Sequence, residues 1–171
     1  MYDWELNDDA LKTWVRLRQA SEAMERVLGA RLDEHDATLA QIDVLGVLSA
    51  SKVLLRPGTI GSYTFRQQHS VSAQLGRMRK AGLITKTRGK KDERAVTVKI
   101  TPKGKERLEK TREDGLGQAR KLLKAALSDE EIKQLDGLLK KVRDQALQRL
   151  GTKAERLPDS LDVSRFEAKL A

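Results

Sequence analysis

One stretch of this sequence, between residues 83 and 100, has the pattern of a β-hairpin. Leu83–Arg88 predicts a first strand, and Arg94–Ile100 predicts a second strand with β-branched alternation. The residues between them, Gly89–Glu93, form a charged turn. Helical patterns precede and follow the hairpin, so we expect a chain that is mainly α with a small β-wing.

Helical periodicity is strong in the first third of the chain. Apolar residues three or four apart predict a long helix over Asp8–Glu34. Thr38 and Gln41 fit a capping box that begins a second helix, which ends near Ala50. Pro57 suits the first turn of a short third helix, about 57–64.

A fourth helix is expected just before the hairpin, over Ser70–Ala81, with Gly82 as its stop. Its buried stripe consists of three apolar residues at i, i+4 and i+7: Val71, Leu75 and Met78. Leu54–Leu55 predicts a short strand between the second and third helices.

Two further helices are expected after the hairpin. Thr101 and Pro102 suit the start of a helix over 102–126, which Gly115 and Gly117 should weaken or bend. Ser128 begins a second capping box, and the helix that follows stops at Gly151. We expect this last helix to bury one apolar stripe: Ile132, Leu135, Leu138, Leu139, Val142 and Ala146.

This order of elements predicts a winged helix-turn-helix flanked by long N- and C-terminal dimerisation helices. The third and fourth helices make the helix-turn-helix, and the hairpin is the wing. We expect an N-terminal dimerisation helix over residues 1–36 and a winged helix-turn-helix DNA-binding domain over 37–101. C-terminal dimerisation helices follow over 102–150, and the role of the tail, 151–171, is open.

Positive charge is concentrated in one segment. The chain carries 34 Lys+Arg and 25 Asp+Glu, a net charge of +9. Residues 66–110 hold 14 basic and 4 acidic residues, whereas the rest of the chain holds 20 and 21. A solubility surplus would scatter over the surface, so this concentration favours a binding face for a polyanion.

Composition excludes several classes of protein. With no Cys there is no disulfide framework or thiolate metal site, and two His make a poor metal-ligand set or acid–base pair. No nucleotide-binding or hydrolase motif is present, so we expect no enzyme, no metal and no cofactor. No apolar run is long enough to span a bilayer, and no secretory signal is recognisable, so we expect a cytoplasmic protein.

Two stretches resemble the MarR (multiple antibiotic resistance regulator) family of transcription factors. Asp92–Gly104 is similar to the wing signature of that family, and His69–Leu83 is similar to its recognition helix and exit. The resemblance covers about residues 9–150. It implies a homodimer that reads a pseudo-palindromic operator, regulation that is commonly repression, and relief by a small effector. Apolar surface beyond the needs of a small winged helix independently favours a dimer.

The recognition helix is expected to lie in the major groove and the wing in the minor groove. The candidates for the major groove share one helix: His69, Ser70, Ser72, Ala73, Gln74 and Arg77. Ser70 has an alternative role as N-cap, and His69 is either a DNA contact or a capping residue. The wing candidates are Arg88, Lys90, Lys91, Asp92 and Arg94, with Arg94 the minor-groove arginine. The expected phosphate contacts are Arg66, Gln68 and Lys80.

Two questions stay open at this point. Three of the few aromatic residues either line an effector cleft or pack in the core: Trp14, Tyr63 and Phe65. The alternative to a DNA-binding regulator is a winged-helix module that binds RNA or a protein partner. The lack of stacking aromatics in the basic segment argues against single-stranded RNA.

Overall fold

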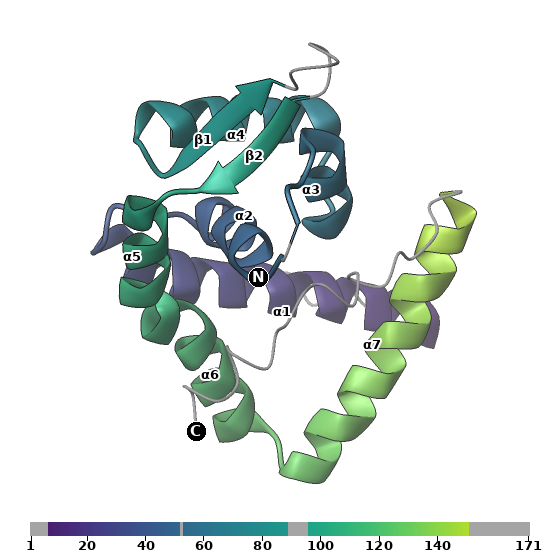
Figure 1. The fold of residues 1–171 in the computed structure, drawn as a ribbon. Coiled ribbons are helices and arrows are strands. Elements are labelled where there is room, and N and C mark those ends of the chain that lie inside the picture. The colour runs from purple at the N-terminus through teal and green to yellow at the C-terminus, as the bar shows by residue number, and fades with distance from the viewer. Residues whose placement is uncertain (1–6, 52, 89–95, 151–171) are drawn as a thin grey trace.

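The structure is a computed structural model that describes residues 7–51, 53–88 and 96–150. Seven α-helices, one π-helical turn and two strands follow one another along this part of the chain (Figure 1). In chain order they are α1 (Asp9–Asp33), α2 (Leu39–Ala50), α3 (Pro57–Tyr63), α4 (Gln68–Lys80), β1 (Ile84–Arg88), β2 (Val96–Ile100), α5 (Pro102–Lys110), η1 (Glu113–Gly117), α6 (Gln118–Ala126) and α7 (Asp129–Arg149). The mainly α fold with a small β-wing is confirmed.

The first two helices begin at side-chain caps. The Asp8 side chain accepts a hydrogen bond from Leu11 N–H at 2.9 Å, and Thr38 accepts from Gln41 N–H at 3.3 Å. The capping box predicted at Thr38 is only half formed, however. Gln41 Oε1 is buried without a hydrogen-bond partner, so it does not accept the reciprocal bond.

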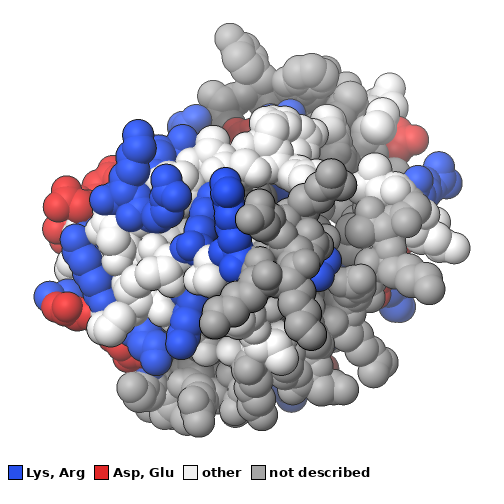
Figure 2. Space-filling view, turned by 45° about the horizontal axis from the view of Figure 1, so that its top comes forward, with Lys and Arg blue, Asp and Glu red and all other residues white. Residues whose placement is uncertain are grey.

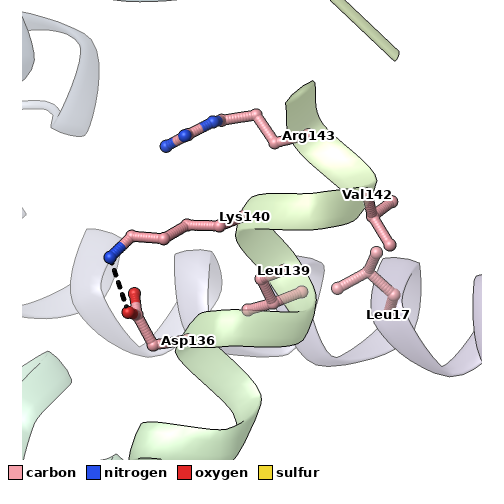
Figure 3. Close-up of a pocket in the computed structure, with 6 residues that line it drawn as sticks. All are labelled: Leu17, Asp136, Leu139, Lys140, Val142 and Arg143. Carbon is pink, nitrogen blue, oxygen red and sulfur yellow. Dashed lines mark ion pairs between the residues drawn. The ribbon is translucent and has the colours of Figure 1, made fainter. Parts of the chain in front are cut away.

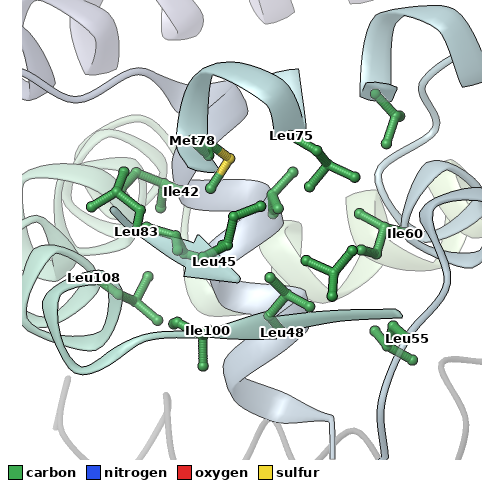
Figure 4. Packing of buried hydrophobic residues seen from close by; sticks show 14 of the residues in the cluster. Ile42, Leu45, Leu48, Leu55, Ile60, Leu75, Met78, Leu83, Ile100 and Leu108 are labelled. Carbon is green, nitrogen blue, oxygen red and sulfur yellow. The ribbon is translucent and has the colours of Figure 1, made fainter. Parts of the chain in front are cut away.

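The core lies between the helix-turn-helix and the hairpin, with α2 near its centre (Figure 4). Leu45 of α2, Ile60 of α3 and Leu75 of α4 are fully buried. The remaining members come from these helices, α1, α5, the hairpin and the segments that connect them: Leu32, Ala37, Ile42, Val44, Leu48, Leu55, Val71, Met78, Leu83, Ile84, Val98, Ile100 and Leu108. Their burial is the main favourable term that fixes α4 against α2 and the sheet.

The two strands pair antiparallel, with Ile84 opposite Ile100 and Arg88 opposite Val96. Leu55 makes a single bridge to Val98, whose N–H donates to Leu55 O at 2.8 Å. The short strand predicted at Leu54–Leu55 is thus one bridging residue rather than a full strand.

A compact junction joins the end of α4 to the start of α5. Gly82 ends α4 with a φ of +74°, a conformation that favours glycine. The Thr101 hydroxyl donates to Gly82 O at 2.7 Å and accepts from Gly104 N–H at 3.0 Å. Lys103 Nζ donates to Ala81 O at 2.9 Å. The wing is therefore anchored at its base to both helices.

The helix predicted over 102–126 is interrupted where its two glycines stand, as expected. The chain forms α5, then the π-helical turn η1 that holds Gly115 and Gly117, then α6. The turn packs against α1, and His35 Nε2 lies 2.7 Å from Asp114 Oδ2. This contact joins the end of the first helix to the interruption.

The last helix begins at the predicted capping box, with Ser128 and Glu131 bonded reciprocally. Its expected burial is wrong for the single chain, because no residue of α7 is buried. Leu135, Leu138, Leu139 and Val142 are between 37% and 59% exposed. The helix turns back from α6 and reaches α1 (Figure 1).

Candidate nucleic-acid interface

The helix-turn-helix consists of α3 and α4, which pack closely on each other. Pro57 stands in the first turn of α3, where its missing N–H and fixed φ suit a helix start. The turn passes through Phe65, whose φ is +52°, and Arg66 N–H donates to Gly61 O at 3.0 Å. These contacts fix the turn that joins α3 to α4.

The outer face of α4 is polar and basic. Val71, Leu75 and Met78 face the core as predicted. The exposed residues are Gln68, His69, Ser72, Ala73, Arg77, Arg79 and Lys80, and Ser70 is half-buried. Seven of the eight predicted DNA-contact residues on this helix therefore lie at or near the surface, and Gln74 is the exception.

Gln74 was predicted to contact the major groove, and this prediction is wrong. Its side chain is buried, at 6% exposed, beside the apolar stripe. Its Oε1 accepts a hydrogen bond of 2.6 Å from Arg77 Nη2. Its spacing from the core residues explains the burial. Gln74 follows Val71 by three residues, which places it on the inner side of the helix.

The helix also begins two residues earlier than predicted, at Gln68 with Gln67 as N-cap. Ser70 is thus inside the first turn and is not the N-cap, and neither is His69. Gln67 makes no side-chain cap bond to the helix. First-turn N–H groups of this kind are suited to hydrogen-bond a phosphate.

Arg66, a predicted phosphate contact, lies at the turn before α4. Its Nη2 is 3.3 Å from Asp43 Oδ2 on α2, and its side chain is 35% exposed. Burial raises the pKa of Asp43, and the hydrogen bond and charge of Arg66 act in the opposite direction. The pair fixes the guanidinium while part of it stays open to solvent.

The structure describes both strands of the wing, β1 and β2. Arg88 is exposed at the end of β1. The other wing candidates, Lys90, Lys91, Asp92 and Arg94, lie outside the described residues. Their predicted contacts therefore stay predictions.

Charge around this surface has one sign over a long stretch. No Asp or Glu stands between Asp43 and Asp92, a stretch that contains ten Lys and Arg. Figure 2 shows this end of the molecule, where Lys and Arg side chains gather and the visible acidic side chains lie mainly towards the margin. Three exposed or half-buried cations here were absent from the predicted site, although the run without acidic residues could have indicated them: Arg56, Arg79 and Lys86.

A second exposed surface is apolar. Leu17 of α1 and Leu139 and Val142 of α7 point toward one another around a hollow of about 320 Å³ (Figure 3). At its edge Lys140 Nζ pairs with Asp136 Oδ2 at 2.8 Å. Further exposed apolar side chains on the same two helices are Leu11, Trp14, Val27, Leu135 and Leu138.

The three aromatic candidates for an effector cleft have different surroundings. Trp14 is 56% exposed on α1, with the Arg18 guanidinium 5.7 Å from its ring centroid. Tyr63 packs against the core, and Phe65 is 67% exposed at the turn. The hollow shown in Figure 3 is lined by none of them. A shared effector cleft stays a prediction.

Among residues 7–51, 53–88 and 96–150, no cluster of three or more His, Asp or Glu side chains is arranged to hold a metal ion. Within the same ranges, none of the helices has the length and apolar character needed to cross a membrane.

Comparisons with known proteins agree with this geometry. Residues 35–95 match the MarR family model. The organohalide-sensing transcriptional regulator RdhR-CbdbA1625 in its ligand-free form is 25% identical, with 86% of each chain covered and a TM-score of 0.77. AbsC, a MarR family transcriptional regulator from Streptomyces coelicolor, is 22% identical over 85% of this chain and 98% of its own, with a TM-score of 0.75.

A mutant of MarR from E. coli, solved in complex with operator DNA, is 24% identical over 81% of this chain and 99% of its own, with a TM-score of 0.71. No curated protein sequence matches the chain. The resemblance to the MarR family that the sequence suggested is confirmed.

Proposed function

Because residues 35–95 match the MarR family model, we propose that this chain is a homodimeric, sequence-specific regulator of transcription that binds double-stranded DNA. One observation carries the proposal. The exposed face of α4 is polar and basic, and it lies within a stretch of 48 residues, 44–91, that lacks any Asp or Glu. Such a surface suits a polyanion with a groove as wide as a helix.

In this proposal α4 enters the major groove and the wing contacts the adjacent minor groove. His69, Ser72, Ala73 and Arg77 lie on the exposed face that would meet base edges. Arg66, Gln68 and Lys80 would contact phosphates, which fix the register of the protein on the duplex. At the wing, Arg88 and the residues up to Arg94 would complete the contacts.

The homodimer is supported by apolar surface that the single chain leaves exposed. Leu138 and Val142, four residues apart on α7, are 59% and 58% exposed, and Trp14 and Leu11 of α1 are 56% and 51% exposed. Exposed apolar faces of this extent favour a protein–protein interface. A second copy of the chain would cover them and present two recognition helices to one duplex, which implies a pseudo-palindromic site.

Repression, cytoplasmic location and relief by a small effector complete the proposal. One structural neighbour is described as an organohalide sensor and has been solved with 2,4-dichlorophenol bound.

In vitro selection from a library of random-sequence DNA duplexes tests the proposal. We expect enrichment of one pseudo-palindromic site, and binding that weakens steeply with salt because several phosphates are neutralised. The paired controls are Lys80→Ala on α4 and Lys133→Ala on α7, both exposed; only the first should weaken binding.

No enrichment of any duplex would refute the proposed function. Binding of structured RNA in preference to every selected duplex would favour the alternative, a winged-helix module for RNA. Equal effects of the two Lys variants would show that α4 is not the DNA-binding face.

A further inference from the structure

The buried Gln74 has a specific relation to the exposed Arg77 three residues later. We propose that Gln74 is a positioning residue that fixes the Arg77 guanidinium to read a guanine in the major groove. The inference rests on the proposed function and deepens it. It assigns base specificity to a side chain that itself contacts no DNA.

The burial of Gln74 needs an explanation. It stands beside the stripe formed by Val71, Leu75 and Met78, where an apolar side chain would pack without a polar atom to satisfy. A buried amide is costly unless it is hydrogen-bonded. The bond of 2.6 Å that Gln74 Oε1 accepts from Arg77 Nη2 supplies that partner.

A neutral partner orients Arg77 and leaves its charge intact. An Asp or Glu at position 74 would accept the same hydrogen bond but would neutralise the guanidinium charge. The sequence from residue 44 to residue 91 contains no Asp or Glu that could do so. Within the described part of the chain, no carboxylate forms an ion pair with Arg77. The guanidinium has five N–H donors, so donors remain after one is used by Gln74.

Small residues lie beside Arg77 on the helix surface. Ala73 and Gly76 stand next to it, and a Cβ built on Gly76 would meet no atom within 4 Å. On the side of Ala73 a base edge can therefore approach the guanidinium without a bulky neighbour, whereas the exposed Lys80 lies on the C-terminal side. Of the four bases, guanine offers the O6 and N7 acceptors that arginine binds with two parallel hydrogen bonds. Because the Arg77 side chain is already held before DNA binds, less of its conformational entropy is lost on binding.

The experiment compares wild type, Gln74→Leu, Gln74→Glu and Arg77→Ala on synthetic duplexes. The duplexes carry the site enriched by in vitro selection, with each base pair substituted in turn. Leucine matches the apolar stripe and removes the acceptor, whereas glutamate keeps it. Thermal unfolding of every variant is measured in parallel.

We expect Gln74→Leu to lose about tenfold or more of the discrimination at one G·C pair in each half-site, with unchanged salt dependence and no loss of thermal stability. Arg77→Ala should lose the same preference at the same pair, and the double variant should lose no more. Gln74→Glu should retain the preference and bind every duplex more weakly, because its carboxylate neutralises Arg77.

Undiminished discrimination by folded Gln74→Leu would overturn the inference while the proposed function stands. So would a loss spread evenly over all base pairs, which would indicate a structural role. A wild-type protein that shows no preference among duplexes would instead refute the proposed function, and the inference with it.

Discussion

Substitution of Gly104 by alanine should destabilise the protein, because two backbone segments meet at this position. A Cβ on Gly104 would overlap the Leu83 carbonyl oxygen and would lie 2.9 Å from Ile100 Cγ1. The same carbonyl oxygen accepts a hydrogen bond from Thr101 N–H at 3.1 Å. The backbone cannot move aside without breaking that bond at the base of the wing.

Three terms give the expected change in the free energy of unfolding. Forcing an extra methyl group into packed surroundings costs about 1–3 kcal/mol. Loss of the hydrogen bond to Leu83 O costs about 1 kcal/mol. Alanine has the higher helix propensity, which returns up to about 1 kcal/mol. We therefore expect Gly104→Ala to lower the free energy of unfolding by about 1–3 kcal/mol.

The matched control is the same substitution at Gly76, in the middle of α4. A Cβ there meets no atom within 4 Å. Only the propensity term remains, so Gly76→Ala should raise the free energy of unfolding by about 0.5–1 kcal/mol.

Urea unfolding at one fixed protein concentration measures both variants, since the stability of a dimer depends on concentration. The reasoning predicts opposite signs for one chemical change. Gly104→Ala as stable as wild type, or Gly76→Ala destabilised by 1 kcal/mol, would refute it.

Three further predictions concern other parts of the chain. Arg94→Ala should weaken binding to the selected duplex by more than about tenfold, about 1.4 kcal/mol, with unchanged thermal unfolding; equal affinity in a fluorescence anisotropy titration would remove Arg94 from its role. Leu138→Glu should convert the proposed dimer to a monomer in sedimentation velocity, because it places a charge on an exposed apolar face; a persistent dimer would exclude this face as the interface. Ser128→Ala should destabilise the protein at neutral pH by about 1 kcal/mol through loss of the cap. Hydrogen bonds from Ser128 lower the pKa of Glu131 below its usual 4.5, so their stabilising effect is complete above that value and is lost as the pH falls through the lowered pKa. The difference between wild type and Ser128→Ala should therefore shrink in acid to the part that the bond from Glu131 N–H to the Ser128 hydroxyl contributes, and a constant difference from pH 7 to pH 3 would contradict the assignment.

Periodicity and local chemistry predicted most of the fold. Apolar spacing placed the inner stripe of α4, and the residues at Ser128 and Gly82 marked helix ends correctly. The glycines in the middle of residues 102–126 also indicated the interruption at η1. These features depend on residues close in sequence, so the sequence alone can show them.

Features that depend on how a polar side chain is packed or hydrogen-bonded were less accessible. Gln74 was expected to face the DNA because glutamine is polar, whereas its hydrogen bond to Arg77 lets it remain on the inner side of the helix. Gln41 has the residue type of a capping box, yet tertiary packing buries its oxygen away from the cap. The pairing of Arg66 with Asp43 joins residues 23 apart and left no local signal.

The apolar positions of α7 repeat along one helix as expected, but their predicted burial is wrong for the single chain. The pattern shows which side chains are apolar and share a helix face, and it does not show whether anything covers them. In the single chain Leu138 and Val142 remain exposed. A dimer that covers them would reconcile the pattern with the structure.

The most direct test of the central claim is the symmetry and stoichiometry of the complex with a selected DNA duplex. Native mass spectrometry counts the chains on the duplex, and selection gives the spacing of its half-sites. We predict two chains on one duplex, with half-site centres about one helical turn, roughly 10 base pairs, apart. One chain on an asymmetric site, or no duplex selected at all, would contradict the account.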